Sequence, residues 1–241
     1  YCPRRECRVN IIIADTYEEM SRKAADVIAD CLAKDPSCVL GLATGSTPIG
    51  LYAELVRDCE AGKISFADAT TFNLDEYRGL DPRHDQATGT YAAEPVRPCE
   101  RRRCTHARAD GSNPDADAAC AAYEEAIAQA GGVDLQLLGL GHNGHIGFNE
   151  PCDCFPVDTH VVELTESTIQ ANSRLFGSID EVPREAYTMG IGTIMRAAKV
   201  LVVANGEGKA QIVRDAFFGP VTPQVPASVL QLHPDVTVIV D

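Results

Sequence analysis

Val133-Asp134-Leu135-Gln136-Leu137-Leu138-Gly139-Leu140 is followed directly by the loop Gly141-His142-Asn143-Gly144-His145-Ile146-Gly147-Phe148-Asn149-Glu150-Pro151. The apolar run is typical of a buried parallel strand, and open α/β sheets bind their ligands at the carboxyl ends of such strands. Glycines in the loop let the backbone turn tightly or approach a ligand closely. His145 and Glu150 add two groups that can move protons. The stretch therefore predicts an α/β fold and one half of an enzyme site.

Strand-like and helix-like patterns alternate on both sides of this stretch, which predicts βαβ units. The predicted strands span residues 9–14, 38–43, 69–74, 133–140, 160–164, 200–204 and 236–240. The predicted helices span residues 17–33, 49–59, 115–130, 169–176, 192–199 and 209–217. No periodicity is evident from Asp81 to Pro114. We expect residues 1–241 to form a single α/β domain, an open, mostly parallel twisted sheet with helices on both faces (Rossmann-like).

The composition is typical of a soluble globular protein. The 241 residues are 45% apolar and 23% charged, and the formal net charge is -14, which argues against a nucleic-acid partner. No apolar stretch approaches the roughly 20 residues that span a bilayer, so no membrane partner is expected. The 10 cysteines include no Cys-x-x-Cys pair, which favours reduced thiols and a cytoplasmic location over a disulfide framework. Cys152 and Cys154 are more typical of a turn than of a redox or metal site.

Polar residues follow the two predicted strands that end near residues 43 and 74. After the first come Thr44, Gly45, Ser46 and Thr47 at the start of a helix, where backbone N–H groups and hydroxyls form an anion site. The segment is neither a Walker A loop nor a dinucleotide fingerprint, and a simple capped helix start is the alternative. After the second comes Asp75-Glu76, which is either a general base in a pocket or a solvated acidic turn.

Two cations and a set of absences complete the inventory. Arg174 and Lys209 suit phosphate binding, although in isolation each such residue is more often a surface charge than a ligand. His142 and His145 have no third partner at zinc spacing, so no metal is predicted, and no Gly-x-Ser-x-Gly elbow occurs. An anion site, two cations, a carboxylate and a His–Glu pair suit proton abstraction next to a carbonyl on a phosphorylated small molecule.

Signature segments along nearly the whole chain resemble those of glucosamine-6-phosphate deaminases. They are residues 42–48, 71–77, 140–151, 171–174, 190–193, 206–210 and 226–234, in the family's order. That family converts glucosamine 6-phosphate and water to fructose 6-phosphate and ammonia in amino-sugar catabolism, without a metal or organic cofactor. The resemblance therefore implies a hydrolytic, isomerising deaminase whose partner is a small-molecule substrate.

The resemblance also implies a role for each site residue. Asp75 matches the base that takes the proton from C2 of the opened sugar. His145 matches the residue that assists ring opening, Glu150 orients it, and Asn143 lies beside it. The phosphate-binding positions are Thr44, Gly45, Ser46, Thr47, Arg174 and Lys209. Residues 156–175 correspond to a lid that excludes water.

The chain departs from the family pattern at three places. Asn143 stands where some members have Asp; an amide carries no charge, so His145 should be less basic than beside Asp. Hexameric members bind the activator N-acetylglucosamine 6-phosphate through basic residues after the loop, whereas this stretch has Asp153, Asp158, His160 and Val162. We therefore expect no such activation, in a monomer or a homo-oligomer. Residues 87–108 also differ, reading Arg- and Pro-rich where the family has a helix.

Two alternative functions remain open at this point. A 6-phosphogluconolactonase shares the fold and the phosphate loop, but it hydrolyses a lactone and has no need of an enolising base. A non-catalytic sugar-phosphate sensor is the other alternative, although a sensor has no reason to keep Asp75, His145 and Glu150 together. Release of ammonia distinguishes the deaminase from both.

Overall fold

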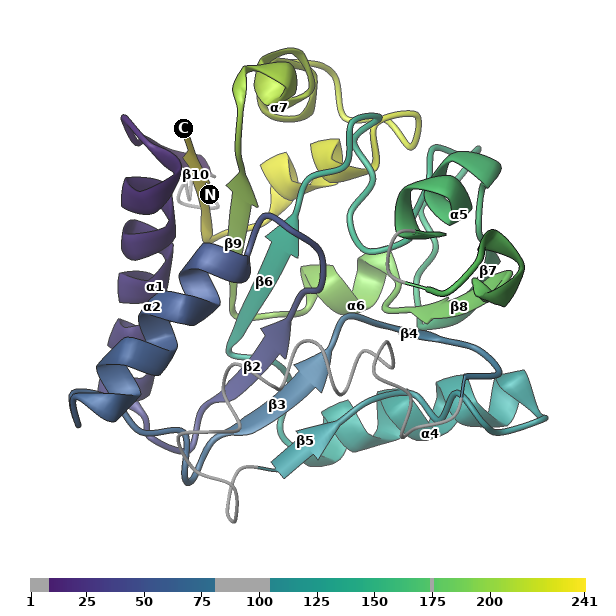
Figure 1. Cartoon of the computed structure of the whole chain (residues 1–241), viewed down its shortest axis with the longest axis horizontal. Coiled ribbons are helices and arrows are strands. Elements are labelled where there is room, and N and C mark those ends of the chain that lie inside the picture. The colour runs from purple at the N-terminus through teal and green to yellow at the C-terminus, as the bar shows by residue number, and fades with distance from the viewer. Residues whose placement is uncertain (1–8, 81–104, 174–175) are drawn as a thin grey trace, which may run out of the picture.

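A seven-stranded parallel sheet forms the centre of the molecule (Figure 1). The computed structural model describes residues 9–80, 105–173 and 176–241. The strand order is β1-β10-β9-β6-β2-β3-β5, and every neighbouring pair is parallel. The strands are β1 (Val9–Ile13), β2 (Val39–Leu42), β3 (Thr70–Asn73), β5 (Thr105–Ala107), β6 (Leu135–Gly139), β9 (Lys199–Ala204) and β10 (Val236–Val240). The central strands are buried on both faces, as a parallel sheet covered by helices requires.

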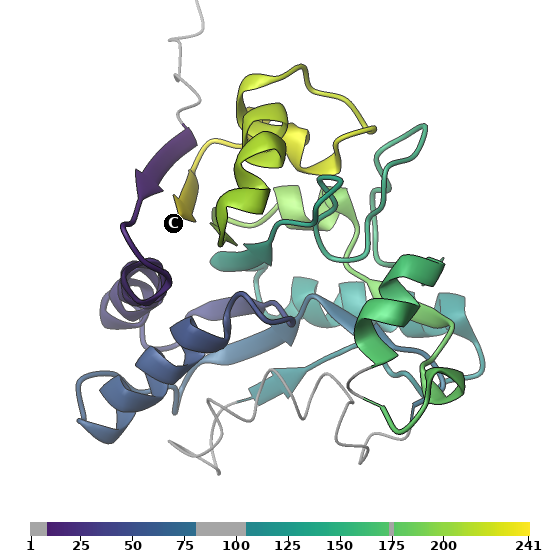
Figure 2. The same cartoon turned by 45° about the horizontal axis from the view of Figure 1, so that its top comes forward.

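Helices cover both faces of this sheet. Helices α1 (Tyr17–Lys34) and α2 (Ile49–Glu60) pack together on one side, while α4 (Ala116–Gln129) and α6 (Ile191–Met195) lie on the other (Figures 1 and 2). Helix α7 (Ala210–Phe218) follows β9. The hydroxyl of Thr16 caps α1 by accepting from the Glu19 N–H, and Asp115 caps α4 in the same way. The buried faces of these helices and the sheet share one hydrophobic core.

The direction of winding reverses between β2 and β6. From β2 the chain proceeds through β3 to β5 toward one edge, whereas from β6 it proceeds through β9 and β10 toward the other. Loops that leave two adjacent strands in opposite directions open a crevice at the carboxyl ends of those strands, where α/β proteins bind ligands. The loops after β2 and β6 are the two that the sequence predicts to carry the site.

A small antiparallel sheet, absent from the sequence prediction, adjoins this crevice. Its order is β4-β8-β7, formed by β4 (Asp75–Tyr77), β8 (Glu185–Thr188) and β7 (His160–Glu163). Helix α5 (Glu166–Asn172) follows β7 and lies beside this sheet in Figure 1. Strands β4 and β8 are short and carry polar residues, so neither the apolar run nor the alternation that identifies a strand is present.

The remaining predicted elements are confirmed with small shifts at their ends. Helix α6 ends at Met195 rather than at residue 199, and α5 begins at Glu166 rather than at residue 169. The prediction missed β5 and the 3-10 turns η2 (Ile179–Glu181), η3 (Glu207–Lys209) and η4 (Pro226–Leu232), because elements this short have no measurable periodicity. Among the helices of the described residues, none has the length and apolar character needed to cross a membrane.

Candidate active site

Asp75 lies where the chain passes from the main sheet to the small one. Strand β3 ends at Asn73, the backbone bends at Leu74, and β4 begins with Asp75. Hydrogen bonds fix the bend, since the Leu74 N–H donates to the Leu42 carbonyl (2.9 Å) and the Met189 N–H donates to the Leu74 carbonyl (2.8 Å). The side chain of Asp75 is therefore held at the carboxyl end of β3, beside the loop after β2.

Burial makes Asp75 an unusual carboxylate. The residue is only 6% exposed, and desolvation raises its pKa to about 7. The hydroxyl of Thr44 donates to Oδ1 (3.1 Å) and moves the pKa down, while the neighbouring Glu76 moves it up. A carboxyl group that titrates near neutrality can both accept a proton and return it, as a general base needs to do. The solvated acidic turn, one of the two predictions for Asp75-Glu76, is excluded by this burial.

Glu76 is also buried but has a different environment from Asp75. It is 3% exposed, and its Oε2 lies 3.4 Å from a guanidinium nitrogen of Arg108. Its Oε1 accepts a hydrogen bond from the Tyr77 N–H (2.9 Å). Arg108 follows β5, in the part of segment 87–108 that departs from the family pattern, and residues 105–107 of that segment pair in parallel with β3. Residues 81–104 lie outside the described part of the chain.

The loop after β6 places His145 near enough to Asp75 to interact with it electrostatically. Gly144 and Gly147 have φ angles of 87° and 59°, which side-chain-bearing residues rarely adopt. At Gly141 the constraint is space, because a Cβ there would lie 2.4 Å from atoms of the His145 ring. The ring therefore lies across the backbone of Gly141, and the electrostatic interaction between His145 and Asp75 lowers the pKa of the carboxyl group.

Glu150 and Asn143 form a connected pair beside the His145 ring. Glu150 Oε1 lies 3.3 Å from His145 Nδ1, and Glu150 Oε2 accepts a hydrogen bond from the Asn143 amide (2.5 Å). Contact with His145 is the main cause that lowers the pKa of Glu150 and keeps it ionised. Asn143 Oδ1 accepts from the backbone N–H of His145 (3.2 Å). Asn143 therefore positions the imidazole indirectly, through its bonds to Glu150 and to the His145 backbone.

In the predicted phosphate loop after β2, the polar side chains have different hydrogen-bond partners. Gly45 and Ser46 are exposed, and Gly45 has a φ angle of 100°. The Thr44 hydroxyl donates to Asp75 as described, and the Thr47 hydroxyl donates to Asn205 Oδ1 (2.8 Å). The sequence thus placed these residues correctly at one loop, while the structure shows that two of the three hydroxyls already have partners within the protein.

Lys209 approaches the same end of the sheet from the segment after β9. Its Nζ donates to the carbonyl of Leu140 (2.6 Å), the residue that follows β6 by one position. Burial lowers the pKa of Lys209. Together with the Thr47–Asn205 bond, this contact ties the ends of β2, β6 and β9 to one another. Arg174, the second predicted cation, lies outside the described residues.

Several residues that support the site were missed by sequence reasoning. Tyr52 donates to the Ala43 carbonyl (2.7 Å), and Tyr123 donates to the Asn73 carbonyl. Each bond holds the backbone just before a site residue, Thr44 or Asp75. Tyr17 donates to the Thr47 carbonyl (3.0 Å) and accepts from the Gly50 N–H (2.8 Å). Asn149 donates to the carbonyls of Ile146 and Met189. All four look like ordinary core or loop residues in the sequence, and only their contacts reveal the role.

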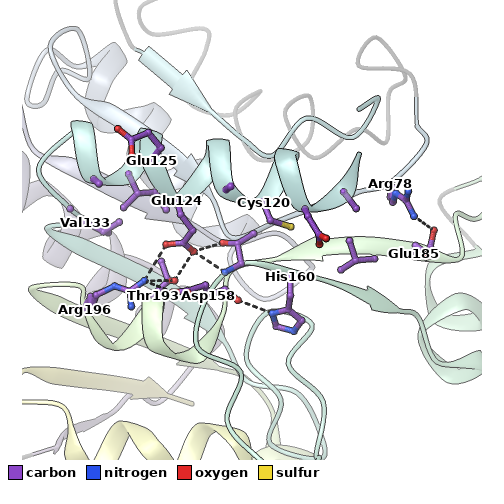
Figure 3. Close-up of a pocket in the computed structure, with 18 of the residues that line it drawn as sticks. Arg78, Cys120, Glu124, Glu125, Val133, Asp158, His160, Glu185, Thr193 and Arg196 are labelled. Atoms are coloured by element: carbon purple, nitrogen blue, oxygen red, sulfur yellow. Dashed lines mark hydrogen bonds and ion pairs between the residues drawn. The ribbon is translucent and has the colours of Figure 1, made fainter. Parts of the chain in front are cut away.

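A large groove elsewhere in the molecule contains none of the predicted site residues (Figure 3). Its volume is about 1370 Å³, and it lies between α4 and the segment that leads into β7. Glu124 lines the groove and bonds to several of its other residues. Its Oε1 accepts hydrogen bonds from the Thr159 N–H (2.8 Å), the Thr159 hydroxyl (2.6 Å) and the Thr193 hydroxyl (2.7 Å). Arg196 pairs with Glu124 Oε2 and with Asp158, at 3.1 Å each. The groove's charges are thus largely satisfied within the protein.

In the described part of the chain, Cys31, Cys38, Cys59, Cys120, Cys152 and Cys154 form no disulfide. Cys152 and Cys154 belong to one turn, in which the Cys152 thiol donates to the Cys154 carbonyl (2.7 Å). Within residues 9–80, 105–173 and 176–241, no cluster of His, Cys, Asp and Glu could hold a metal ion.

Comparison with known proteins agrees with this geometry. The profile of glucosamine-6-phosphate isomerases and 6-phosphogluconolactonases matches residues 14–239. The chain belongs to this family. A glucosamine-6-phosphate deaminase of Lachnoclostridium phytofermentans is 50% identical over 236 residues, covering 96% of this chain and 98% of that protein. One from Bacillus velezensis is 49% identical over 234 residues, covering 97% of each.

Solved structures separate the two branches of the family. A monomeric glucosamine-6-phosphate deaminase superimposes with a TM-score of 0.91 at 43% identity, covering 97% of both chains. A 6-phosphogluconolactonase of Trypanosoma cruzi superimposes with a TM-score of 0.74 at 18% identity, covering 98% of this chain and 95% of the other. The lactonase shares the fold alone, so the comparisons support the deaminase prediction over the lactonase alternative.

Proposed function

We propose that this chain converts glucosamine 6-phosphate and water to fructose 6-phosphate and ammonia. The observation that carries the proposal is a buried carboxyl group, Asp75, whose pKa of about 7 suits a general base. It interacts electrostatically with His145, which contacts Glu150. The relatives at 50% and 49% identity bear the name of this enzyme. The site needs no metal or organic cofactor for this reaction, because each step is a proton transfer or an addition of water.

The residues divide the reaction into steps. Lys209 and the loop of Gly45 and Ser46 bind the phosphate, with Arg174 as a further ligand. His145, held by Glu150 and Asn143, transfers a proton between the ring oxygen and the anomeric hydroxyl so that the sugar ring opens to the aldehyde. The carboxylate of Asp75 then takes the proton from C2, which gives an enolamine. Return of that proton to C1 gives a ketose imine, and water replaces its nitrogen to release ammonia.

The two alternatives make different demands on these residues. A lactonase opens an ester by hydrolysis and never removes a carbon-bound proton, so a buried carboxyl group with a pKa near 7 next to the sugar carbons has no task in it. A sensor domain has no use for the Glu150–His145 contact. The burial of Asp75 therefore favours the deaminase among the three.

Production of ammonia and fructose 6-phosphate from glucosamine 6-phosphate, measured in the presence of EDTA, tests the proposal. We expect both products in equal amounts. A folded protein that forms neither product contradicts the proposal, and hydrolysis of 6-phosphogluconolactone by that protein would then establish the lactonase.

We further propose that residues 1–241 act as one domain with a small-molecule substrate and without activation by N-acetylglucosamine 6-phosphate. The segment after the loop offers carboxylates rather than cations, and Arg196, which lies beside Asp158, is already paired. A monomer and a homo-oligomer both remain compatible with this site. Initial rates at sub-saturating substrate, with and without N-acetylglucosamine 6-phosphate, test the absence of activation. An increase in rate contradicts it.

A further inference from the structure

The Thr44 hydroxyl is hydrogen-bonded to Asp75, the proposed base, although Thr44 belongs to the predicted phosphate loop. Thr44 Oγ1 donates to Asp75 Oδ1 at 3.1 Å, although the two residues are 31 positions apart in the chain. A hydroxyl has one proton to donate, and phosphate oxygens mainly accept hydrogen bonds. While Thr44 donates to Asp75, its side chain cannot also donate to a substrate phosphate.

The backbone around Thr44 is fixed from two sides, so this contact is built into the fold. The buried Tyr52 hydroxyl donates to the carbonyl of Ala43, the residue just before Thr44. The Leu42 carbonyl, at the end of β2, accepts from the N–H of Leu74, the residue just before Asp75. The same pair of strand ends therefore carries both partners, and β2 and β3 pair in register up to Leu42 and Asn73.

Other groups close to Asp75 also act on its charge. Glu76, on the same strand, carries a like charge, and the phenol groups of Tyr52 on α2 and Tyr123 on α4 donate elsewhere, to backbone carbonyls. His145, on the loop after β6, interacts with Asp75 electrostatically. Burial and Glu76 favour the protonated carboxyl group, whereas Thr44 and His145 favour the ionised form that can accept a proton.

We propose that Thr44 is a positioning residue for Asp75, holding the carboxylate in its orientation and in its ionised form for proton abstraction from C2 of the substrate. The inference rests on the proposed function, because it assigns Thr44 to the base of that reaction. It also distinguishes Thr44 from Gly45 and Ser46, which lie in the same loop but are exposed.

The pH dependence of kcat/KM in Thr44→Val and Thr44→Ser tests this inference. Valine keeps the shape of the side chain and removes the donor. A hydrogen bond to a charged group is strong enough to move a pKa by about one unit. We expect the acidic limb of the profile to move upward by about one pH unit in Thr44→Val, which lowers kcat/KM at pH 7 about fivefold. Thr44→Ser, which keeps the hydroxyl, should restore the wild-type limb.

Thr47→Val is the matched comparison, because its hydroxyl bonds to Asn205 in the same loop and not to Asp75. We expect it to change KM without moving the limb. An unchanged limb in Thr44→Val overturns the inference, and a higher KM in that case identifies Thr44 as a phosphate ligand. If Thr44→Val does not fold, Thr44→Ala removes the same donor and is read in the same way. A wild-type protein without deaminase turnover would contradict the proposed function itself, before any variant is compared.

Discussion

At the scale of single residues, the environment of two carboxyl groups divides their tasks. Asp75 is buried and its pKa rises to about 7, whereas Glu150 contacts the His145 ring and its pKa falls. One group can therefore exchange a proton near neutral pH while the other stays charged and orients the imidazole. Neither property follows from residue type, because both groups are carboxylic acids.

Replacing Asp75 by Asn should leave substrate binding nearly unchanged and lower kcat by about two to four orders of magnitude, as loss of a general base does. The amide keeps the shape and can still accept the Thr44 hydrogen bond, so KM reports the intact site. Steady-state kinetics measure both constants. Turnover close to that of the wild type would show that another group removes the C2 proton.

The same variant should be more stable than the wild type above pH 7. The pKa of Asp75 is raised on folding from 3.8 to about 7, so the folded state loses stability as pH rises through that window. Asn carries no charge to desolvate, and the gain reaches at most about 4 kcal/mol, at about 1.4 kcal/mol per unit. Thermal unfolding measured above pH 7 and below pH 3.8 tests this. The difference in Tm should vanish at the acidic pH, and an equal gain at both would contradict the explanation.

Lys209→Ala should chiefly raise KM, since Lys209 is proposed to bind the non-reacting phosphate. Some loss of kcat is compatible with this role, because phosphate binding can also drive catalysis. Lys199→Ala is the control, since Lys199 begins β9 at the opposite end of the strand and is half exposed. A KM that is unchanged in Lys209→Ala would remove Lys209 from the phosphate site.

At the scale of elements, the site depends on how each strand ends. Strand β6 ends at Gly139, and two residues later the His145 ring occupies the space where a Cβ of residue 141 would lie. Strand β3 ends in a bend that turns Asp75 into the small sheet. Backbone hydrogen bonds hold both places: the Gly141 N–H donates to the His145 carbonyl (2.9 Å), and the Leu74 N–H donates to the Leu42 carbonyl (2.9 Å). The positions of the proton-transfer groups therefore follow from how the chain leaves each strand.

Gly141→Ala should lower kcat by more than about tenfold, since an added Cβ 2.4 Å from the ring displaces His145 and small errors in position are costly. Gly139→Ala is the matched control, because a Cβ at Gly139 meets nothing within 4 Å. Comparison of kcat in the two variants, with circular dichroism to confirm folding, measures the effect. Equal kcat values would show that the loop can shift without loss of function.

At the scale of the whole molecule, Glu124 joins parts that the chain separates widely. It lies on α4 and accepts hydrogen bonds from Thr159, which precedes β7 of the small sheet, and from Thr193 on α6, which leads into the main sheet (Figure 3). This one carboxylate thus links α4 to the segments that lead into both sheets. Its place in the groove is structural in character, since its contacts lie within the protein.

Glu124→Ala should lower the free energy of unfolding by about 2–3 kcal/mol, because it leaves the partners of a partly buried charged group unsatisfied. Glu125→Ala is the control: Glu125 is the next residue on α4, is exposed, and bonds to Gln129 on its own helix. Urea unfolding of both variants measures the difference. Equal stability of the two would show that the Glu124 contacts contribute little.

The sequence by itself determined the alternating architecture, the two loops at the switch point and the family. Long apolar runs and amphipathic helices have a period that can be read locally, and the loop after β6 carries its motif in consecutive residues. The predicted strands β1, β2, β3, β6, β9 and β10 all appear in the main sheet. These features depend on neighbours along the chain, which is why they could be predicted.

Only the tertiary structure determined which partners the site residues have and how deeply they are buried. The Thr44–Asp75 bond joins residues 31 apart, the Thr47–Asn205 bond joins residues 158 apart, and the small sheet pairs β4 with β8 across more than 100 residues. Burial of Asp75 arises from elements that converge from the whole chain. The pKa of Asp75, the hydrogen-bond partners of the site and the short strand β4 all depend on residues that are distant in the sequence. No local sequence pattern can therefore predict them.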